Sequence, residues 1–338
     1  MRIIGYILST AFMLASFVGA GQDLHFSHFD KNPLYINPAM AGKFNGKYKL
    51  MSIARNQWNT VTVPYRSFGA MAEFSQIVDG SPIGSAFSLY RDVAGDSRFT
   101  TTKLDVGLSY SVSVNYNRTS VVAFGLQAGM HHYGLDYSQL SWDNQYDNDS
   151  GFNPGLPSRE STEFQSIFAP SASAGVAFIK QRGRYTFIGG VGAYNLLRGN
   201  LSFSRIGVEE VKQNIRLNYY GSMEILSGKF VFVPTLLRTQ SSVLHESIVG
   251  FKTRYQPDAY LPELSLGVMY RWKDAFVLTT GAAYGPWEAG FSFDINTSNL
   301  VRASNGYGAV EFFISYVGQS TKRAVKRKNR FQVCPTYI

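Results

Sequence analysis

The sequence contains a single cysteine, Cys334, among its 338 residues. An intramolecular disulfide is therefore excluded. The body of the chain also has no run of about 18 apolar residues, which excludes a transmembrane helix there. Only 16% of the residues are charged, whereas 32 are glycine, 25 phenylalanine and 21 tyrosine. The mean hydropathy is only −0.10, and low overall hydropathy with many glycines and aromatic residues is typical of a membrane β-barrel, whose lumen face is polar and whose interfaces carry aromatic girdles.

The formal net charge is +9, but little of it belongs to the body of the chain. One positive charge is Arg2, and six more lie near the C-terminus: Lys322, Arg323, Lys326, Arg327, Lys328 and Arg330. Subtracting these seven charges leaves +2 for the residues between them, a balance that does not indicate nucleic-acid binding. The tail is either a solvated end or a segment that docks to an acidic periplasmic partner or cell-wall polymer.

The segment Trp287–Ile295 shows the pattern that predicts the fold. Its odd positions are apolar and its even positions are polar or small, as in Phe291 and Ser292. Successive side chains of a strand point to opposite sides, so such a strand has one apolar and one polar face. Comparable segments lie near 47–58, 65–76, 82–92, 98–112, 118–131, 168–180, 184–194, 212–226, 228–238, 243–255, 261–272, 274–284, 286–296 and 306–317.

These segments number fourteen, and bacterial barrels have an even number of strands. The alternating runs last about nine to twelve residues, enough to cross a membrane as tilted strands. In a soluble sandwich the charged residues of the polar face would be buried at a cost, whereas in a wide barrel they touch lumen water. We therefore predict an all-β, antiparallel transmembrane β-barrel of the outer membrane over residues 47–317, rather than a soluble sandwich.

The N-terminal residues do not follow this pattern. Residues 1–20 have the features of a secretory signal peptide, with Arg2 before an apolar stretch and small residues at its end. Residues 21–46 do not alternate, and Pro33 and Pro38 prevent regular sheet pairing. Irregular backbone cannot face lipid, but it can lie inside a lumen or outside the membrane. We predict that residues 21–46 form a plug or a periplasmic lead-in.

An even strand count also predicts the topology. Both chain ends then lie on the periplasmic side, and short periplasmic turns alternate with longer outer loops. The longest connections fall in alternate positions, at 132–167, 195–211 and 297–305, and are predicted to face outward. The basic tail, 318–338, is then predicted to be periplasmic.

A few polar clusters invite a chemical interpretation. Two adjacent histidines precede a group of aspartates: His131 and His132, then Asp136, Asp143, Asp147 and Asp149. They suggest a hydrolase or metal site, but no catalytic motif surrounds the histidines, and the aspartates lack the closing glutamate of a calcium loop. Gly189–Gly192 lacks the Lys-Ser/Thr of a phosphate loop. We predict no enzyme activity, no cofactor and no metal site.

A motif near the N-terminus resembles that of a known family. It comprises Gln22-Asp23, Phe26-Ser27, Phe29, the run Asn32-Pro33-Leu34-Tyr35-Ile36-Asn37-Pro38-Ala39-Met40-Ala41-Gly42, and Arg55-Asn56-Gln57-Trp58. Weaker matches are Tyr194–Leu197 and Asp294–Leu300. With these residues the sequence resembles the PorP/SprF family of type IX secretion system membrane proteins from Bacteroidota. That family often ends in Cys-Pro-Arg-Phe, whereas this chain continues from Cys334-Pro335 with Thr336-Tyr337-Ile338.

The resemblance implies an outer-membrane protein that supports protein secretion, gliding motility or adhesin display, and it favours docking of the basic tail over a solvated end. It implies as partners the outer-membrane lipid, secreted cargo with a type B C-terminal domain, and periplasmic components that include OmpA-like proteins, but no nucleic acid. The candidate site is the family motif: Asn32, Pro33, Tyr35, Asn37, Pro38, Gly42, Arg55, Asn56, Gln57 and Trp58. The alternatives are a passive porin for small solutes and an outer-membrane enzyme, and a plugged lumen would favour the secretion component over a porin.

Overall fold

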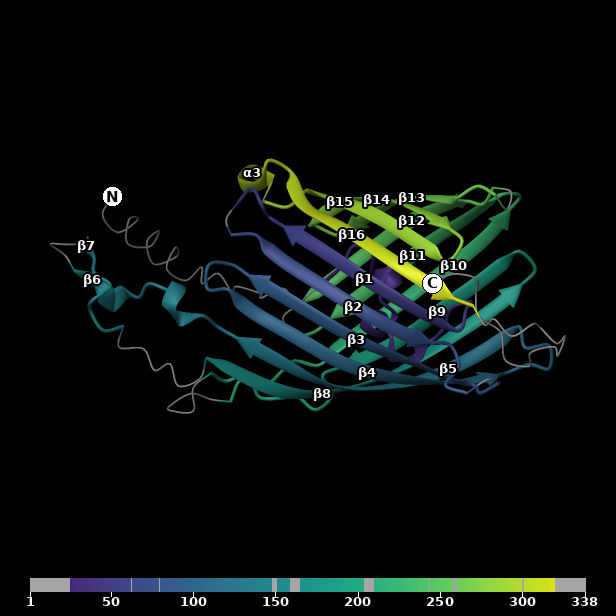
Figure 1. The fold of residues 1–338 in the computed structure, drawn as a ribbon, viewed down its shortest axis with the longest axis horizontal. Coiled ribbons are helices and arrows are strands. Elements are labelled where there is room, and N and C mark those ends of the chain that lie inside the picture. Colours follow the sequence, from purple (N-terminus) through teal and green to yellow (C-terminus); the bar gives the residue numbers. More distant parts are fainter. Residues whose placement is uncertain are drawn as a thin grey trace, which may run out of the picture.

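The computed structural model describes residues 25–319 except positions 62, 79, 148–150, 159–164, 204–209, 243, 258–259 and 300. The predicted signal peptide, the six cations of the tail and Cys334 lie outside the described residues. Fourteen antiparallel strands form one closed barrel (Figure 1). Strand β16 closes onto β1 through ten residue pairs, from Tyr48↔Gly318 to Gln57↔Ala309. The predicted fourteen-stranded antiparallel barrel is confirmed.

The strands of the wall are β1 (Tyr48–Gln57), β2 (Tyr65–Phe74), β3 (Ile83–Ala94), β4 (Phe99–Ser113), β5 (Ser120–Gly134), β8 (Ser166–Arg182), β9 (Tyr185–Tyr194), β10 (Arg216–Ser227), β11 (Phe230–Gln240), β12 (His245–Tyr255), β13 (Glu263–Arg271), β14 (Ala275–Tyr284), β15 (Trp287–Asn296) and β16 (Tyr307–Gly318). The largest difference from the predicted bounds is at β10, expected from 212. Lys212 lies in the connection between β9 and β10, where it forms an isolated bridge with Asn200. The alternating pattern therefore begins before the strand does.

The connections differ between the two ends of the barrel. Short ones join the strands at one end, which we call the turn mouth: 75–82, 114–119, 183–184, 228–229, 256–262 and 285–286. Those at the other end, the loop mouth, are 58–64, 95–98, 135–165, 195–215, 241–244, 272–274 and 297–306. All three connections predicted to be long lie at the loop mouth. The connections 95–98, 241–244 and 272–274 are short exceptions there.

Among the described residues, two loop-mouth connections contain helices or strands of their own. The connection 135–165 holds η3 (Tyr137–Gln139), η4 (Asp143–Gln145), β6 (Tyr146–Asp147) and β7 (Gly151–Phe152), and its described part projects beyond the wall (Figure 1). The connection 297–306 holds α3 (Val301–Ser304). None of the helices in the described residues is long and apolar enough to span a membrane.

The two faces of the wall follow the predicted alternation. Leu104, Val106 and Leu108 point outward and are exposed, whereas Asp105 between them is buried on the lumen side. The expectation that lumen-facing residues touch water is wrong at many positions, as at the fully buried Ser292. The reason is that the lumen is filled by another part of the chain.

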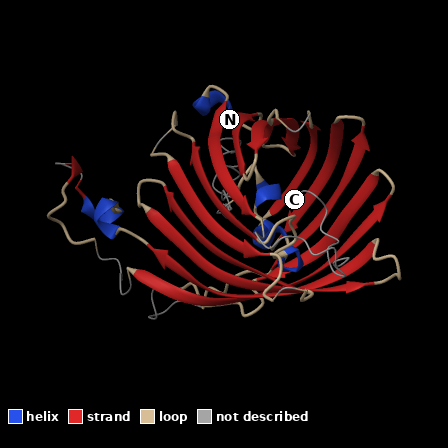
Figure 2. Ribbon diagram, turned by 45° about the vertical axis from the view of Figure 1, so that its right-hand side comes forward, coloured by secondary structure: helices blue, strands red, loops and turns tan. Residues whose placement is uncertain are grey.

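That filling is residues 25–46, which we call the lumen segment. It contains the short helices η1 (Phe29–Lys31), α2 (Pro33–Ile36) and η2 (Pro38–Met40), which lie inside the barrel (Figure 2). Each proline is the first residue of a helix, where the N–H that it lacks would have no intrahelical partner. Most side chains of the segment are buried against lumen-facing residues of the wall.

The described chain begins and ends at opposite mouths. His25 lies beside Arg55, near the end of β1 at the loop mouth. Gln319 follows β16 at the turn mouth and donates to the Asn45 carbonyl. The prediction that both chain ends lie on the periplasmic side concerns residues 1–24 and 320–338, outside the described range, and stays a prediction.

Candidate functional site

On one side of the lumen, charged side chains of the wall bind the lumen segment. We call this side the charged wall: Arg55 of β1, Lys252 of β12, Arg271 of β13, Glu288 and Asp294 of β15, and Glu311 of β16. The backbone N–H groups of Ser27 and His28 donate to the two carboxylate oxygens of Glu311, at 2.8 and 2.7 Å. One carboxylate thus accepts from two successive amides of the segment.

Arg55 joins this contact to a second carboxylate. Its Nη2 lies 2.8 Å from Asp294 Oδ2, and its Nη1 lies 3.3 Å from Glu311 Oε2. Ser27 Oγ accepts from Arg55 Nη1 at 2.8 Å and donates to Asp294 Oδ1 at 2.7 Å. Arg271 adds a contact to Asp294 at 3.3 Å. All these side chains are buried, so a carboxylate or guanidinium left without its partner would be costly. Because Ser27 lies within the cluster, the cluster holds the segment in one position.

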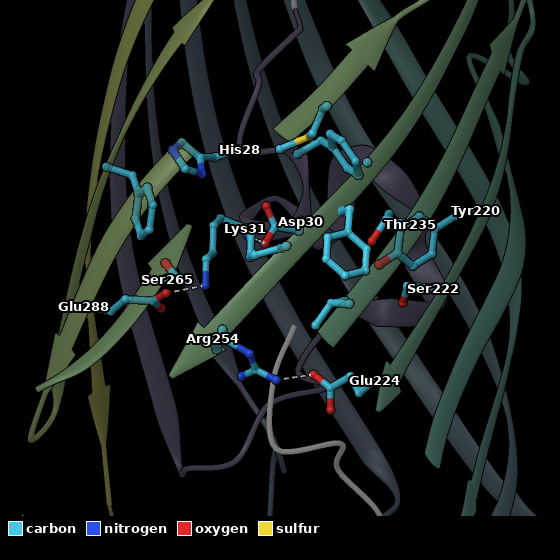
Figure 3. Close-up of a pocket in the computed structure, with 17 residues that line it drawn as sticks. His28, Asp30, Lys31, Tyr220, Ser222, Glu224, Thr235, Arg254, Ser265 and Glu288 are labelled. Carbon is cyan, nitrogen blue, oxygen red and sulfur yellow. Dashed lines mark hydrogen bonds and ion pairs between the residues drawn. The ribbon is translucent and has the colours of Figure 1, made fainter. Parts of the chain in front are cut away.

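A second ionic group surrounds a cavity of about 60 Å³ beside η1 (Figure 3). Lys31 pairs with Glu288 at 2.6 Å, and Lys252 pairs with Asp30 at 2.5 Å. Burial alone would raise the pKa of Asp30 and lower that of Lys31. The opposite charges outweigh burial, so the pKa of Asp30 lies far below its usual range and that of Lys31 lies above its own.

His28 borders the same cavity, where Lys252 and Lys31 together outweigh the nearby acid Asp30. Burial, together with the positive charges of Lys252 and Lys31, lowers the pKa of His28 to about 4. Its ring packs on Phe313 with centroids 4.6 Å apart, and neither ring nitrogen has a hydrogen-bond partner among the described residues. His28 is therefore held neutral at ordinary pH.

The opposite side of the lumen approaches the segment through glycines. We call it the glycine wall: Gly84 of β3, Gly107 of β4, Gly125 of β5, Gly175 of β8, and Gly190 and Gly192 of β9. A Cβ on Gly125 would lie 2.1 Å from Ala39 N, and one on Gly175 would lie 2.0 Å from Asn37 Oδ1. Only glycine allows the backbone of the wall to come this close.

Side chains of the wall also bind the backbone of the segment. Tyr194 Oη donates to the Leu34 carbonyl at 2.8 Å. Asn218 Nδ2 donates to the carbonyls of Tyr35 and Ile36. These contacts satisfy carbonyl groups that a four-residue helix cannot pair itself.

Most motif residues of the segment take part in these contacts. Asn32 accepts from Tyr90 Oη at 3.0 Å, and the Tyr35 ring lies 4.6 Å from the Arg216 guanidinium. Asn37 caps η2 through Ala39 N and donates to the Val176 carbonyl.

Three other motif residues of the segment are placed by the backbone. Pro33 starts α2, and Pro38 packs against Gly125. Gly42 has φ +69° and donates to Glu73 Oε2 at 3.1 Å.

The motif residues after Arg55 are not gathered at the segment. Asn56 points outward and is exposed. Gln57 Oε1 accepts from Arg55 Nε at 3.4 Å, and Trp58 has φ +58° and packs against Tyr65 at the loop mouth. Of the four residues, only Arg55 reaches the segment directly.

The two adjacent histidines face opposite sides of the wall. His131 faces the lumen, where its Nε2 lies 3.3 Å from Asp105 Oδ1. His132 faces outward and packs on Phe168. Asp136 accepts from the N–H and Oγ of Ser138 in the projecting connection. Among the described residues no three His, Cys, Asp or Glu side chains are placed to hold a metal ion.

The candidate site predicted from the sequence did not include the wall residues that hold the segment: Glu73, Tyr194, Asn218, Asp294 and Glu311. Tyr194 and Asp294 stood only in the weaker family matches. Each of the five occupies a lumen-facing position of a predicted strand, so a charged or amide residue on the polar face was the available signal. The partner of each of these residues could not be predicted, because that partner is in the lumen segment, far away in the sequence.

Three comparisons with known proteins bear on these features. The family described as "Type IX secretion system membrane protein PorP/SprF" matches residues 18–316. No curated protein matches the sequence. Among solved structures, the Ralstonia pickettii toluene transporter TbuX aligns with a TM-score of 0.50 at 9% identity, over 84% of this chain and 92% of TbuX. A TodX mutant described as a monoaromatic hydrocarbon channel aligns with a TM-score of 0.50 at 8% identity, over 84% and 93% of the two chains. At this identity the likeness shows the barrel fold of outer-membrane channels.

Proposed function

Because the chain belongs to the PorP/SprF family of type IX secretion system membrane proteins, we propose that it is a plugged, non-enzymatic component of that system. In this role the barrel supports secretion or surface display of cargo proteins by binding a cargo C-terminal domain and periplasmic partners. The family membership makes it an outer-membrane β-barrel of the secretion system, while the partners and the division of tasks are the proposal.

The observation that carries the proposal is the anchored lumen segment. A passive porin needs a water-filled lumen, whereas here residues 25–46 are fixed to both sides of it. The anchoring groups are buried ion pairs and backbone hydrogen bonds, which are costly to break. Such a filling suits a protein that presents binding surfaces and holds a closed barrel, rather than one that passes small solutes.

The orientation follows from the same proposal. The loop mouth, with its long connections, faces the cell exterior, and the turn mouth faces the periplasm. The tail that follows Gly318 then starts on the periplasmic side, where its six cations would attract an acidic partner. The loop mouth would meet cargo at the cell surface.

Crosslinking followed by pull-down from the native outer membrane tests the proposal. We expect recovery of periplasmic secretion components and an exported cargo protein, and a loss of the periplasmic partner after truncation at residue 318. Single-channel recordings in planar bilayers provide the second arm. The intact protein should conduct little, and deletion of residues 25–46 should raise conductance. A large conductance of the intact protein, with no partner recovered, would establish the porin instead.

A further inference from the structure

A cavity of about 370 Å³ opens at the loop mouth, above the lumen segment. We call it the vestibule. The first described residue of the lumen segment, His25, lines it together with the loop-mouth ends of several strands and the connection 195–215. Its volume lies in the range of pockets that take small ligands or a few side chains.

One side of the vestibule is aromatic. Phe99 stacks on Tyr133 with ring centroids 6.3 Å apart and meets Phe203 edge-on at 6.4 Å. Tyr65 and Leu201 also line the cavity. A large apolar or aromatic side chain of a ligand would pack against these groups.

The floor of the vestibule is basic. Lys103 and Arg216 line it, and Asp92 is the only carboxylate among its described lining residues. The Arg216 guanidinium lies between the rings of Tyr35 and Tyr194, at 4.6 and 4.5 Å from their centroids. This stacking fixes the direction of the cation, and a fixed guanidinium is well suited to a carboxylate.

Below this floor lies a second cavity of about 30 Å³, lined in part by the same Lys103 and Arg216 and by the carboxylate of Asp105. Its buried polar atoms include Ser88 Oγ, Gln127 Oε1 and Ser173 Oγ, which have no hydrogen-bond partner among the described residues. Buried polar atoms without partners are rare in folded proteins unless water or a ligand pairs with them. The space under the two cations is therefore built for polar occupants.

The vestibule also carries side-chain amides. Gln213 Nε2 donates to Tyr133 Oη at 2.7 Å, while its buried Oε1 has no partner among the described residues. Asn195, Asn214 and Gln57 line the same cavity. Amides both donate and accept hydrogen bonds, as a peptide backbone requires, whereas a hydrocarbon ligand requires neither.

We propose that the vestibule binds an extended peptide segment of an exported protein, with an aromatic side chain against Phe99 and Phe203 and a neighbouring carboxylate at Lys103 and Arg216. The amides would pair with the peptide backbone. This proposal rests on the proposed function, because it assigns to the loop mouth the contact with cargo. It adds the chemistry of the recognised segment: aromatic and acidic.

Binding of capped pentapeptides to the full-length protein in detergent tests the proposal, with fluorescence anisotropy as the readout. The probe is Gly-Asp-Phe-Asp-Gly, compared with Gly-Lys-Phe-Lys-Gly and Gly-Asp-Ala-Asp-Gly. We expect each comparison peptide to bind at least tenfold more weakly, because one reverses the charge at the basic floor and the other removes the ring. Equal affinity for the acidic and basic peptides would overturn the proposal.

Substitutions in the wall locate the site. Lys103→Gln and Phe99→Ala should each weaken binding of the acidic peptide about tenfold. Phe124→Ala, which changes an outward-facing phenylalanine, should leave binding unchanged. Heat-modifiability on gels reports that each variant is folded. If folded Lys103→Gln and Phe99→Ala bind as well as the parent protein, the site is not the vestibule.

Two results would separate the possible occupants. If the peptide binds only after deletion of residues 21–24, the chain's own N-terminal residues occupy the vestibule and the proposal for an exported partner is wrong. If no peptide binds while the pull-down recovers cargo, the vestibule proposal fails and the proposed function stands.

Discussion

The two sides of the lumen hold the same segment by different physics. The charged wall uses Arg55, Asp294 and Glu311, whose attraction is strong because the group is buried. The glycine wall uses close approach, as at Gly125, and hydrogen bonds to backbone carbonyls. The first kind of contact depends on protonation and fails when one partner is removed. The second depends on shape and is indifferent to pH.

This difference suggests how the segment could be released. Protonation of one carboxylate removes its ion pair without any movement of the backbone. A packing contact at a glycine loses its van der Waals attraction only when the backbone moves away. We therefore expect the charged wall to be the side on which a partner or a change of pH loosens the segment. The glycine wall fixes where the segment returns.

The largest expected effect is that of Arg55→Ala. Removal of the guanidinium leaves Asp294 and Glu311 buried without their shared cation, and we expect a loss of about 3–5 kcal/mol in the free energy of unfolding. Urea unfolding in detergent measures this loss, and planar-bilayer recordings should show openings that the parent protein lacks. Arg66→Ala, at an exposed arginine of β2, is the matched control and should change neither.

Neutralising one of the stranded carboxylates sharpens the test. In the Arg55→Ala background, Glu311→Gln should recover part of the lost stability, because Gln still accepts a hydrogen bond and carries no charge. A double variant that is weaker than Arg55→Ala would show that the backbone contacts to Glu311, not the ion pairs, hold the charged wall.

Acidification should act on the charged wall through His28. The ordinary pKa of histidine is near 6.5, and that of His28 is lowered to about 4. A displaced segment would therefore bind a proton that the seated segment does not. Above about pH 6.5 the ring is neutral in both states, so the seated segment keeps its full stability relative to the displaced one. As the pH falls toward 4, the displaced segment gains a proton and the seated segment does not, and the free energy that favours the seated segment falls by about 3 kcal/mol at most. The pKa of Asp30 is lowered too, so its contribution is lost only at still lower pH.

The frequency of channel openings between pH 7.5 and 4.5 measures this dependence. His28→Phe should abolish the rise in openings above about pH 4.5, because a phenyl ring fills the site beside Phe313 without titrating. His132→Phe, at the outward-facing histidine, is the control and should preserve the dependence. An unchanged pH profile in His28→Phe would assign the sensitivity to other groups.

The glycine wall should respond to shape alone. Gly125→Val places a side chain against the backbone of Ala39, and overpacking of this kind costs about 1–3 kcal/mol. Urea unfolding should show the loss at pH 7.5 and pH 5 alike. Gly221→Val is the matched control, because a Cβ at Gly221 has no atom within 4 Å. A loss at Gly125 that varied with pH would mean that the two walls are coupled.

The wall was readable from the sequence because lipid imposes its pattern on every strand. Outward positions within the apolar band are apolar whatever their partners, so the alternation at Trp287–Ile295 predicted the strand without knowledge of its neighbours. The filling of the lumen was not readable in the same way. The Arg55–Glu311 pair depends on the register with which β16 closes onto β1, 256 positions away in the chain.

The candidate site was readable only in part. The motif contained Arg55 and the prolines, but Asn56 matches the family pattern and points outward. Gly125 and Gly175 read simply as strand glycines, because their role depends on where Asn37 and Ala39 lie. The expected lumen water was wrong for the same reason: periodicity tells which face is inward, not what occupies the interior.

The smallest expected effect is that of Tyr90→Phe, which probes one neutral hydrogen bond between β3 and the lumen segment. Tyr90 Oη donates to Asn32 Oδ1 at 3.0 Å, and both groups are buried. Removal of the hydroxyl leaves the Asn32 oxygen without this donor and should cost about 0.5–1.5 kcal/mol. Because no charge is involved, the loss should be the same at pH 7.5 and pH 5, and the variant should conduct nearly as little as the parent protein. Tyr110→Phe, at an exposed outward-facing tyrosine of β4, should cost less. A loss for Tyr90→Phe as large as that of Arg55→Ala would mean that Asn32, and not the charged wall, fixes the start of the segment.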